Sequence, residues 1–416
     1  MIYKKIKPHI FIIFFLLGCN SLSKDSQLLT EIFHTMKNDF PTIVADPDLY
    51  QIQILYTQVD RNIDQSPQFT THKFNIDPKR YFYPASTVKF PAAVLALDKL
   101  SRYESLGITI NSKLAIGTGF TGMLPMTEDS SSFDGNASIS QFIKKMFVVS
   151  NDDAFNRVYE FLGQDHLNLR MWELGYPEVR FRQRLSMPLT EEENRHTNPF
   201  YFFDDSDRIL LNQPMHRSDL YLPVNSIENL IGKAFMEDGN KIDGPMDFSV
   251  KNFFKLSDQQ RLLRQVMFPE IADQGNQLYL SEDDYKFLFE WMAKIPRESK
   301  HPSYPDYSLY PDSYCKFFMY GDSNAHIPDH IKIFNKVGWA YGFLTDNAYI
   351  IDTQNGVEFF LSAVIYVNKN GVLNDDEYEF NELGLPFLAS LGNKIYEYEL
   401  GRFKSNQPDF SRFITQ

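Results

Sequence analysis

The alternation of apolar and polar residues predicts strands near both ends of the chain. "YQIQILYTQVD" from Tyr50 alternates as a strand does, and "QFTTHKFNID" from Gln68 predicts a second strand, with turn-forming residues between the two. Near the C-terminus, "HIKIFNKVGWAYG", "FLTDNAYIIDT" and "VEFFLSAVIYVNKN" predict three consecutive strands, with turns at Asp346-Asn347 and Gln354-Asn355-Gly356. Two strands from one end and three from the other predict one five-stranded antiparallel sheet.

Apolar residues at helical spacing predict the helices that flank this sheet. The segment from Leu28 to Phe40 has this spacing, and "LGLPFLASLGNKIYEYEL" closes the chain as a helix. We therefore predict a single α+β domain over 28–416. Its sheet comes from 28–82 and 331–416, and an all-helical part spans 83–330. The stretch from about 200 to 276 is interpreted as an insertion into the helical part.

The first 20 residues have the layout of an export signal. In "MIYKKIKPHIFIIFFLLGCN" a cationic start precedes the apolar run Ile10 to Leu17, which is too short for a permanent membrane span. Leu16-Leu17-Gly18-Cys19 resembles the lipobox of bacterial lipoproteins. That resemblance implies removal of residues 1–18, acylation of Cys19, and a tether over 19–27. We expect an exported lipoprotein of the cell envelope, on the periplasmic face of a membrane or on the outer membrane.

Composition narrows the possible partners and cofactors. A net charge of -13 argues against nucleic acid as a partner, because phosphate binding needs a basic surface. With Cys19 acylated, Cys315 has no disulfide partner, and a small buried side chain is expected there. His326 and His330 are four residues apart, but Pro328 lies between them. We therefore predict no metal site and no cofactor.

The stretch "YFYPASTVKFPAAVLALDKL" contains the strongest candidate chemistry. Residues three apart share a helical face, so a lysine amine there can reach the serine hydroxyl, provided that burial keeps the amine partly neutral. Alternatively, the serine is a helix cap and the lysine a surface residue. Ser-x-x-Lys occurs three times, but only the second pair opens a predicted helix after an extended segment: Ser21/Lys24, Ser86/Lys89 and Ser313/Lys316.

Two later motifs give this pair a context. Ser150-Asn151-Asp152 opens another predicted helix, and Lys336-Val337-Gly338 lies on a predicted strand. This order resembles the S-x-x-K, S-D-N and K-T-G set of class A β-lactamases and penicillin-binding proteins. "YLSEDDYKFLFEWMAKIP" from Tyr279 resembles the helix before the K-T-G strand of class A enzymes. The resemblance implies the β-lactamase/transpeptidase-like fold.

The resemblance also implies catalytic roles. Ser86 would attack an amide carbonyl and form an acyl-enzyme. Lys89 would take the proton from the Ser86 hydroxyl, and Ser150 would relay a proton to the leaving nitrogen.

Four further residues would bind the substrate. Lys336 would attract a substrate carboxylate, and Asp152 would lie beside a substrate carbonyl. The backbone N–H groups of Ser86 and Trp339 would form an oxyanion hole. Gly338 would leave room for the substrate beside the strand.

The sequence departs from the family pattern at three places. Asp152 replaces an asparagine and, when ionised, only accepts hydrogen bonds. Val337 lacks the hydroxyl that would contact a substrate carboxylate. "SMPLTEEENRHTNP" lies where the omega loop of class A enzymes is expected. Glu191, Glu192 or Glu193 could activate the deacylating water there, or the run is a solvated face with a capping box that starts at Thr190.

We predict a serine hydrolase that forms an acyl-enzyme on Ser86, with β-lactam hydrolysis as the first choice. A D-Ala-D-Ala carboxypeptidase or transpeptidase acting on peptidoglycan peptides is the alternative enzyme. A non-catalytic envelope lipoprotein, which uses the same fold to bind a ligand, is the alternative outside catalysis. Ser-His-Asp catalysis is not supported, since the chain has no G-x-S-x-G elbow.

Overall fold

The computed structural model describes residues 25–119, 122–224, 227–273 and 275–414. The predicted signal, Cys19 and most of the predicted tether lie outside these ranges. Within them, every helix is too short or too polar to cross a bilayer.

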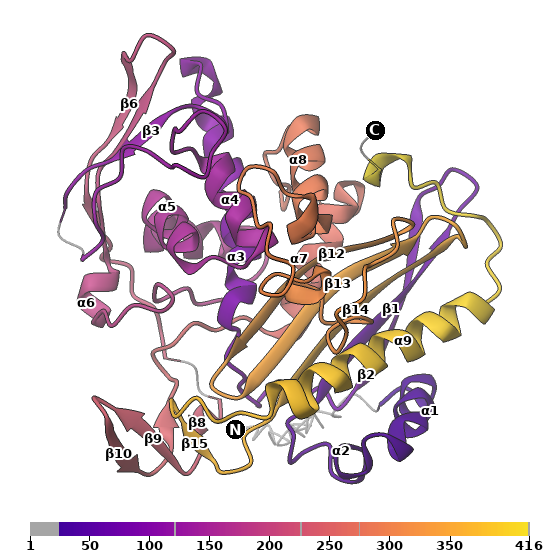
Figure 1. The fold of residues 1–416 in the computed structure, drawn as a ribbon. Helices are drawn as coiled ribbons and strands as arrows, with labels where there is room; N and C mark the ends of the chain where they lie inside the picture. Colours follow the sequence, from indigo (N-terminus) through magenta and orange to yellow (C-terminus); the bar gives the residue numbers. More distant parts are fainter. Residues whose placement is uncertain (1–24, 120–121, 225–226, 274, 415–416) are drawn as a thin grey trace, which may run out of the picture.

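A five-stranded antiparallel sheet forms the centre of the fold (Figure 1). Its strands are β1 (Gln53–Arg61), β2 (Pro67–Phe74), β12 (Ile331–Ala340), β13 (Phe343–Asp352) and β14 (Val357–Tyr366). The order across the sheet is β12-β13-β14-β1-β2, and every neighbouring pair is antiparallel. The predicted α+β sheet, built from both ends of the chain, is confirmed.

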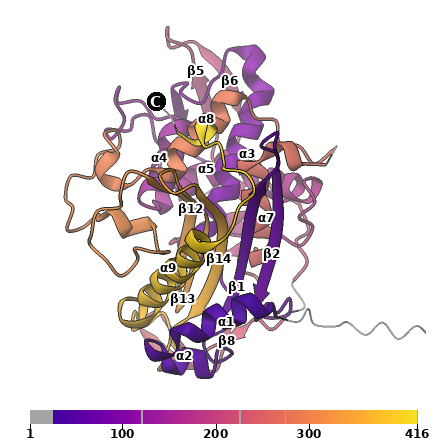
Figure 2. The same ribbon diagram turned by 90° about the vertical axis from the view of Figure 1, so that its right-hand side faces the viewer.

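Helices cover both faces of this sheet, which explains why its central strands are buried on both sides. Successive residues of a strand point to opposite faces, so β13 sends Leu344 and Ile350 to one core and Phe343 and Tyr349 to the other. The first core is closed by α1 (Gln27–Thr35) and α9 (Leu385–Gly401), which crosses the sheet in Figure 2. The second is closed by α7 (Leu256–Met267) and α8 (Glu282–Ala293).

A layer of helices lies beside the sheet and carries two of the predicted motifs. Its members are α3 (Lys89–Leu100), α4 (Ile139–Val148) and α5 (Asp152–Glu173), and α3 packs against both of the others. α3 is buried on nearly every side, and its sequence is apolar apart from Lys89, Asp98 and Lys99. Two shorter helices are α2 (Pro41–Ala45) and α6 (Glu191–Asn194).

The middle of the chain is not wholly helical, which corrects the prediction for this part. β3 (Leu114–Ile116), β5 (Phe200–Phe203) and β6 (Ile209–Gln213) form one small sheet. β9 (Ala234–Glu237) and β10 (Asn240–Asp243) form a hairpin around Asp238-Gly239, whose positive φ angles of 49° and 77° suit a tight turn. The hairpin continues into β15 (Val372–Leu373), which runs parallel to β9. Two further strand pairs are β4 (His196–Thr197) with β7 (His216–Arg217), and β8 (Leu230–Ile231) with β11 (Met246–Asp247).

The predicted turn at Asp346-Asn347 is wrong, because both residues lie inside β13. The chain turns instead at Tyr341-Gly342, where both φ angles are positive (54° and 82°). Asp346 is fully buried and accepts hydrogen bonds from the backbone N–H groups of Phe317 and Phe318. These backbone partners, from a segment remote in the sequence, satisfy a polar residue that the sequence predicts to form a turn. The second predicted turn, Gln354-Asn355-Gly356, lies between β13 and β14 as expected.

Candidate active site

Ser86 lies on a short 3₁₀ turn, Ala85–Val88, that leads into α3. Ala85 has a positive φ of 46°, an uncommon conformation for a residue with a side chain. The turn packs directly on β12 at Gly338, where a Cβ atom would lie 2.6 Å from the Pro84 carbonyl oxygen and 3.1 Å from the Ser86 nitrogen. The missing side chain of Gly338 therefore makes room for the backbone of this turn. That corrects the expectation that it makes room for the substrate.

The amine of Lys89 is buried directly beneath Ser86. Lys89 has no exposed surface, and its Nζ donates to Ser86 Oγ at 2.7 Å. The same amine donates to the Ser150 carbonyl oxygen at 2.5 Å and forms an ion pair with Asp152. The lysine is therefore not the surface residue of the alternative interpretation, and it contacts the hydroxyl that the sequence singles out.

Ser150 bridges the two lysines of the site. Its Oγ accepts from Lys89 at 3.2 Å and from Lys336 at 2.8 Å. Lys336 lies on β12, is almost fully buried, and also donates to the Val337 carbonyl oxygen at 2.9 Å. Ser86, Lys89, Ser150 and Lys336 thus form one continuous chain of hydrogen bonds between three segments that are remote in sequence.

The start of α5 explains how Ser150 and Asp152 both reach the cleft. Asn151, between them, is the N-cap: its side chain accepts from the backbone N–H of Ala154 at 2.8 Å. Ser150 has a positive φ of 55°, which turns its carbonyl and hydroxyl oxygens toward Lys89. Asp152 is held from its other side by Ser186, whose Oγ donates to Oδ2 at 2.5 Å.

The buried charges perturb one another strongly. Burial lowers the pKa of Lys89 below its usual value, and the Asp152 carboxylate opposes part of this shift. Burial and the charge of Lys89 lower the pKa of Lys336 to about 7. Burial alone would raise the pKa of Asp152, but its ion pair with Lys89 holds it below the usual value. Asp152 and Lys89 therefore stabilise each other's charged forms, while burial and the charge of Lys89 bring the pKa of Lys336 close to neutral pH.

Ser86 opens into a cleft of ≈ 730 Å³. One wall includes Trp339, which is 41% exposed and stacks on Phe317 with ring centroids 5.5 Å apart. Another wall comes from the β9–β10 hairpin and from the segment after β15, which Figure 1 shows next to each other. The cleft is therefore lined by both ends of the chain and by the inserted strands.

The part of the chain that carries Ser86, Lys89 and Ser150 is similar to a known protein family. Residues 49–212 match the model of the Beta-lactamase enzyme family. The match includes Ser86, Lys89 and Ser150, and it ends before Lys336. Residues 49–212 are therefore similar to this family, in agreement with the superfamily that the motifs indicate.

Solved structures similar to this chain include those of three bacterial proteins. A beta lactamase from Xanthomonas campestris is 11% identical, with a TM-score of 0.47, over 89% of this chain and 97% of its own. The class A beta-lactamase from Mycobacterium abscessus is 12% identical, with a TM-score of 0.45, over 89% and 98%. The β-lactamase from Streptomyces albus G is 11% identical, with a TM-score of 0.46, over 89% and 98%. No curated protein matches the chain.

The side chain of Val337 does not face the cleft, contrary to the expectation from the sequence. Its side chain is 1% exposed and belongs to the core under α9. Lys336 faces Ser150, so the next residue of the strand points to the opposite face of the sheet. The expected loss of a substrate contact at Val337 therefore does not follow, because this side chain packs away from the cleft.

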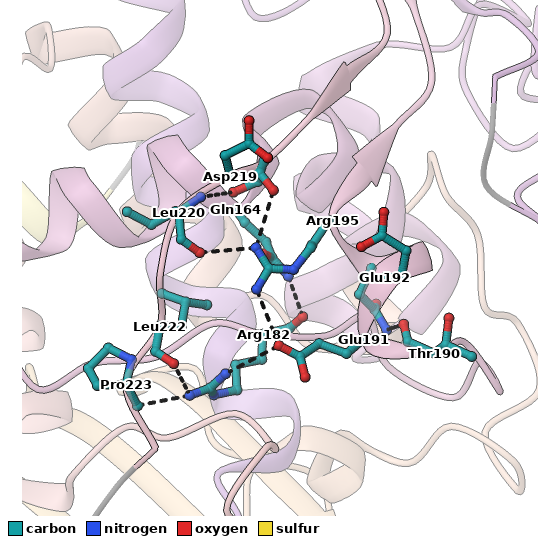
Figure 3. Close-up of polar contacts among 12 residues, drawn as sticks. Gln164, Arg182, Thr190, Glu191, Glu192, Arg195, Asp219, Leu220, Leu222 and Pro223 are labelled. Atoms are coloured by element: carbon teal, nitrogen blue, oxygen red, sulfur yellow. Dashed lines mark hydrogen bonds and ion pairs between the residues drawn. The ribbon is translucent and has the colours of Figure 1, made fainter.

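The acidic run 191–193 is engaged outside the cleft, and none of its residues lines it. Glu193 closes a capping box by accepting from the Thr190 N–H and hydroxyl at 2.7 and 2.8 Å. Glu192 pairs with Arg217 at 2.8 Å. Figure 3 shows Glu191 between the guanidinium groups of Arg195 and Arg182, at 3.3 and 3.9 Å. The capping interpretation of this run therefore describes its contacts, and no member of it is positioned to activate water beside Ser86.

Sequence reasoning missed several residues of the site. Ser186 holds Asp152, and Lys251, Glu237 and Asp376 line the cleft. Ser186 has a positive φ of 52°, which no local sequence signal announces. The other three lie in or beside short strands that the sequence does not reveal clearly, so no motif pointed to them.

Proposed function

We propose that this protein is a serine hydrolase that forms an acyl-enzyme on Ser86. The observation that carries the proposal is the 2.7 Å contact between Lys89 Nζ and Ser86 Oγ, with Ser150 joining Lys89 to Lys336. A buried amine beside a hydroxyl is the arrangement that activates a serine nucleophile without a histidine.

In the proposed reaction, Ser86 Oγ attacks the substrate carbonyl carbon, and its proton passes to Lys89. Lys89 must first lose a proton, because Asp152 stabilises its ammonium form. Ser150 offers a route for that proton to Lys336, whose pKa of about 7 allows it to be neutral at physiological pH. When the tetrahedral intermediate collapses, the C–N bond breaks and the Ser150 hydroxyl gives a proton to the leaving nitrogen.

Backbone N–H groups would stabilise the negative charge that develops on the carbonyl oxygen. We assign this role to the N–H groups of Ser86 and Trp339. The contact of the Ser86 turn with Gly338 supports the assignment, because it brings the two backbones together.

We propose β-lactams as the first substrate class and their hydrolysis as the reaction. The match to the Beta-lactamase enzyme family supports this choice. A D-Ala-D-Ala carboxypeptidase or transpeptidase is the second candidate, and one observation favours it. Glu191, Glu192 and Glu193 are engaged in structural contacts, so water activation and deacylation are expected to be slow.

The lifetime of the acyl-enzyme separates these two candidates. Purified protein is mixed with excess benzylpenicillin, and ring opening is followed by absorbance. Steady turnover after the first equivalent supports the lactamase. A burst of one equivalent, followed by an adduct that persists for minutes to hours, supports the peptidase. No ring opening at all contradicts both and leaves the binding module, which the Lys89–Asp152 ion pair favours.

We also propose that the mature protein is anchored at the cell envelope through acylated Cys19. The sequence pattern "LLGC" at the end of an apolar run supports this proposal. Metabolic labelling with a palmitate analogue should label the wild-type protein and not Cys19→Ala. Equal labelling of both would refute the anchor.

A further inference from the structure

The cations around the cleft differ in whether they already have a partner. Arg184 lines the cleft, but its guanidinium pairs with Glu160 at 2.9 Å and donates to the His196 carbonyl oxygen at 2.7 Å. Lys89 and Lys336 are held by the groups described above. Lys251 also lines the cleft and is half-buried. Across the part of the chain that the structure describes, no carboxylate or other acceptor contacts its amine.

The backbone that carries Lys251 is fixed on several sides. The Lys251 N–H donates to the Phe248 carbonyl oxygen at 3.0 Å. The next residue, Asn252, accepts at its carbonyl oxygen from the Tyr81 hydroxyl at 2.8 Å, and its side-chain oxygen accepts from the Arg182 N–H at 2.7 Å. These contacts fix the backbone of Lys251 at the cleft, so no change of the backbone is needed for its amine to meet an anion.

The turn that carries Lys251 packs against Tyr341, just beyond the end of β12. Phe248, the turn partner of Lys251, packs on the rings of Tyr83 and Tyr341, with centroids 5.8 and 5.1 Å away. Tyr341 is five residues beyond Lys336, a separation of roughly 15 Å along an extended strand. Burial alone lowers the pKa of Lys251, with no contribution from any neighbouring charge, which agrees with this separation.

We infer that Lys251 forms a second anion-binding subsite, which takes a carboxylate on the acyl-donor side chain of the substrate; this inference rests on the proposed acyl transfer at Ser86. The leaving group lies toward Ser150 and Lys336, so the opposite end of the cleft receives the acyl side chain. Glu237, Asp238 and Asp376 also line the cleft, and their charges disfavour an anion beside them. The substrate class is therefore an amide or β-lactam whose acyl part ends in a carboxylate.

Two penicillins that differ only at the end of the acyl chain test this subsite. One carries an adipoyl side chain, which ends in a carboxylate, and the other carries the uncharged hexanoyl chain of the same length. We expect the wild-type protein to be acylated about tenfold more efficiently by the adipoyl compound, because only its carboxylate can accept a charge-assisted hydrogen bond from Lys251. Lys251→Met should lose this preference, and Lys251→Arg should keep most of it. Lys241→Ala, at an exposed position on β10, serves as the matched control and should keep all of it.

Equal acylation by the two penicillins, or a preference that survives in Lys251→Met, overturns the subsite. Acylation by neither penicillin would instead refute the proposed function, and a binding measurement then decides the subsite by itself. N-adipoyl-D-alanine and N-hexanoyl-D-alanine are titrated into Ser86→Ala by calorimetry. Tighter binding of the adipoyl compound, abolished in Ser86→Ala/Lys251→Met, supports the subsite. Equal affinity overturns it.

Discussion

At the scale of single residues, the site depends on how three buried charges share their protons. Asp152 stands where the superfamily motif has asparagine, and it forms an ion pair with Lys89. A carboxylate in direct contact with the Lys89 amine stabilises its ammonium form, and this opposes the use of Lys89 as a base. Lys336 limits this effect, because its own pKa of about 7 provides a neutral amine within reach through Ser150.

Asp152→Asn should therefore speed acylation near neutral pH. Removing the anion lowers the pKa of Lys89, so a larger fraction of its amine is neutral and the acid limb of the pH–rate profile moves to lower pH. We expect a rate increase of about three- to tenfold at pH 7, since one unit of pKa changes the neutral fraction about tenfold. The acylation rate is measured by stopped-flow with a chromogenic β-lactam between pH 5 and pH 9.

Asp153→Asn is the control for this substitution. Asp153 is exposed and, among the described residues, forms an ion pair only with Arg157, at 3.4 Å, so its replacement should leave the profile unchanged. An acid limb in Asp152→Asn that stays in place, or that moves to higher pH, would show that Asp152 does not hold the proton on Lys89.

At the scale of elements, the site requires close contact between the Ser86 turn and β12. Gly338 permits this contact, because the Pro84 carbonyl oxygen and the Ser86 nitrogen occupy the space of a Cβ atom. The same contact sets the distance between the two backbone donors that we assign to the oxyanion hole. The strand and the turn therefore act as a single unit.

Gly338→Ala should separate the Ser86 turn from β12. The added methyl group would lie 2.6 Å from the Pro84 oxygen, so the turn must shift away from β12. We expect the acylation rate to fall about 100-fold, since shifts near 1 Å have effects of that size on positioned groups. Gly401→Ala, at the end of α9, has open space around its Cβ position and should react like the wild type. A normal rate in Gly338→Ala would contradict this account of the contact.

The helices and strands of the structure differ in how well the sequence predicts them. The sequence predicted all five strands of the main sheet, from alternation in the first segment and from apolar stretches near the C-terminus, which are buried on both faces. The order of the three motifs indicated which hydroxyl and amines meet. The short strands of the inserted region were missed, since two- to five-residue segments carry little periodic signal. The buried Asp346 was misread as a turn because its partners are 28 and 29 residues away.

At the scale of the whole molecule, the cleft lies where the two ends of the chain meet the middle. The main sheet comes from both ends, the Ser86 and Ser150 segments come from the helical layer, and the β9–β10 hairpin pairs with β15 from the C-terminal part. A wall built from an insertion can vary without disturbing the buried lysines. The residues of the proposed reaction and the cleft wall from the insertion therefore belong to different parts of the fold.

The account rests on Ser86 as the nucleophile, and one mass measurement tests this directly. The protein is incubated with benzylpenicillin and quenched within seconds, and the intact mass and the peptide that contains Ser86 are measured. We predict an increase equal to one penicillin on that peptide in the wild-type protein and no increase in Ser86→Ala. An unmodified wild-type protein, or an adduct that persists in Ser86→Ala, would contradict the central claim.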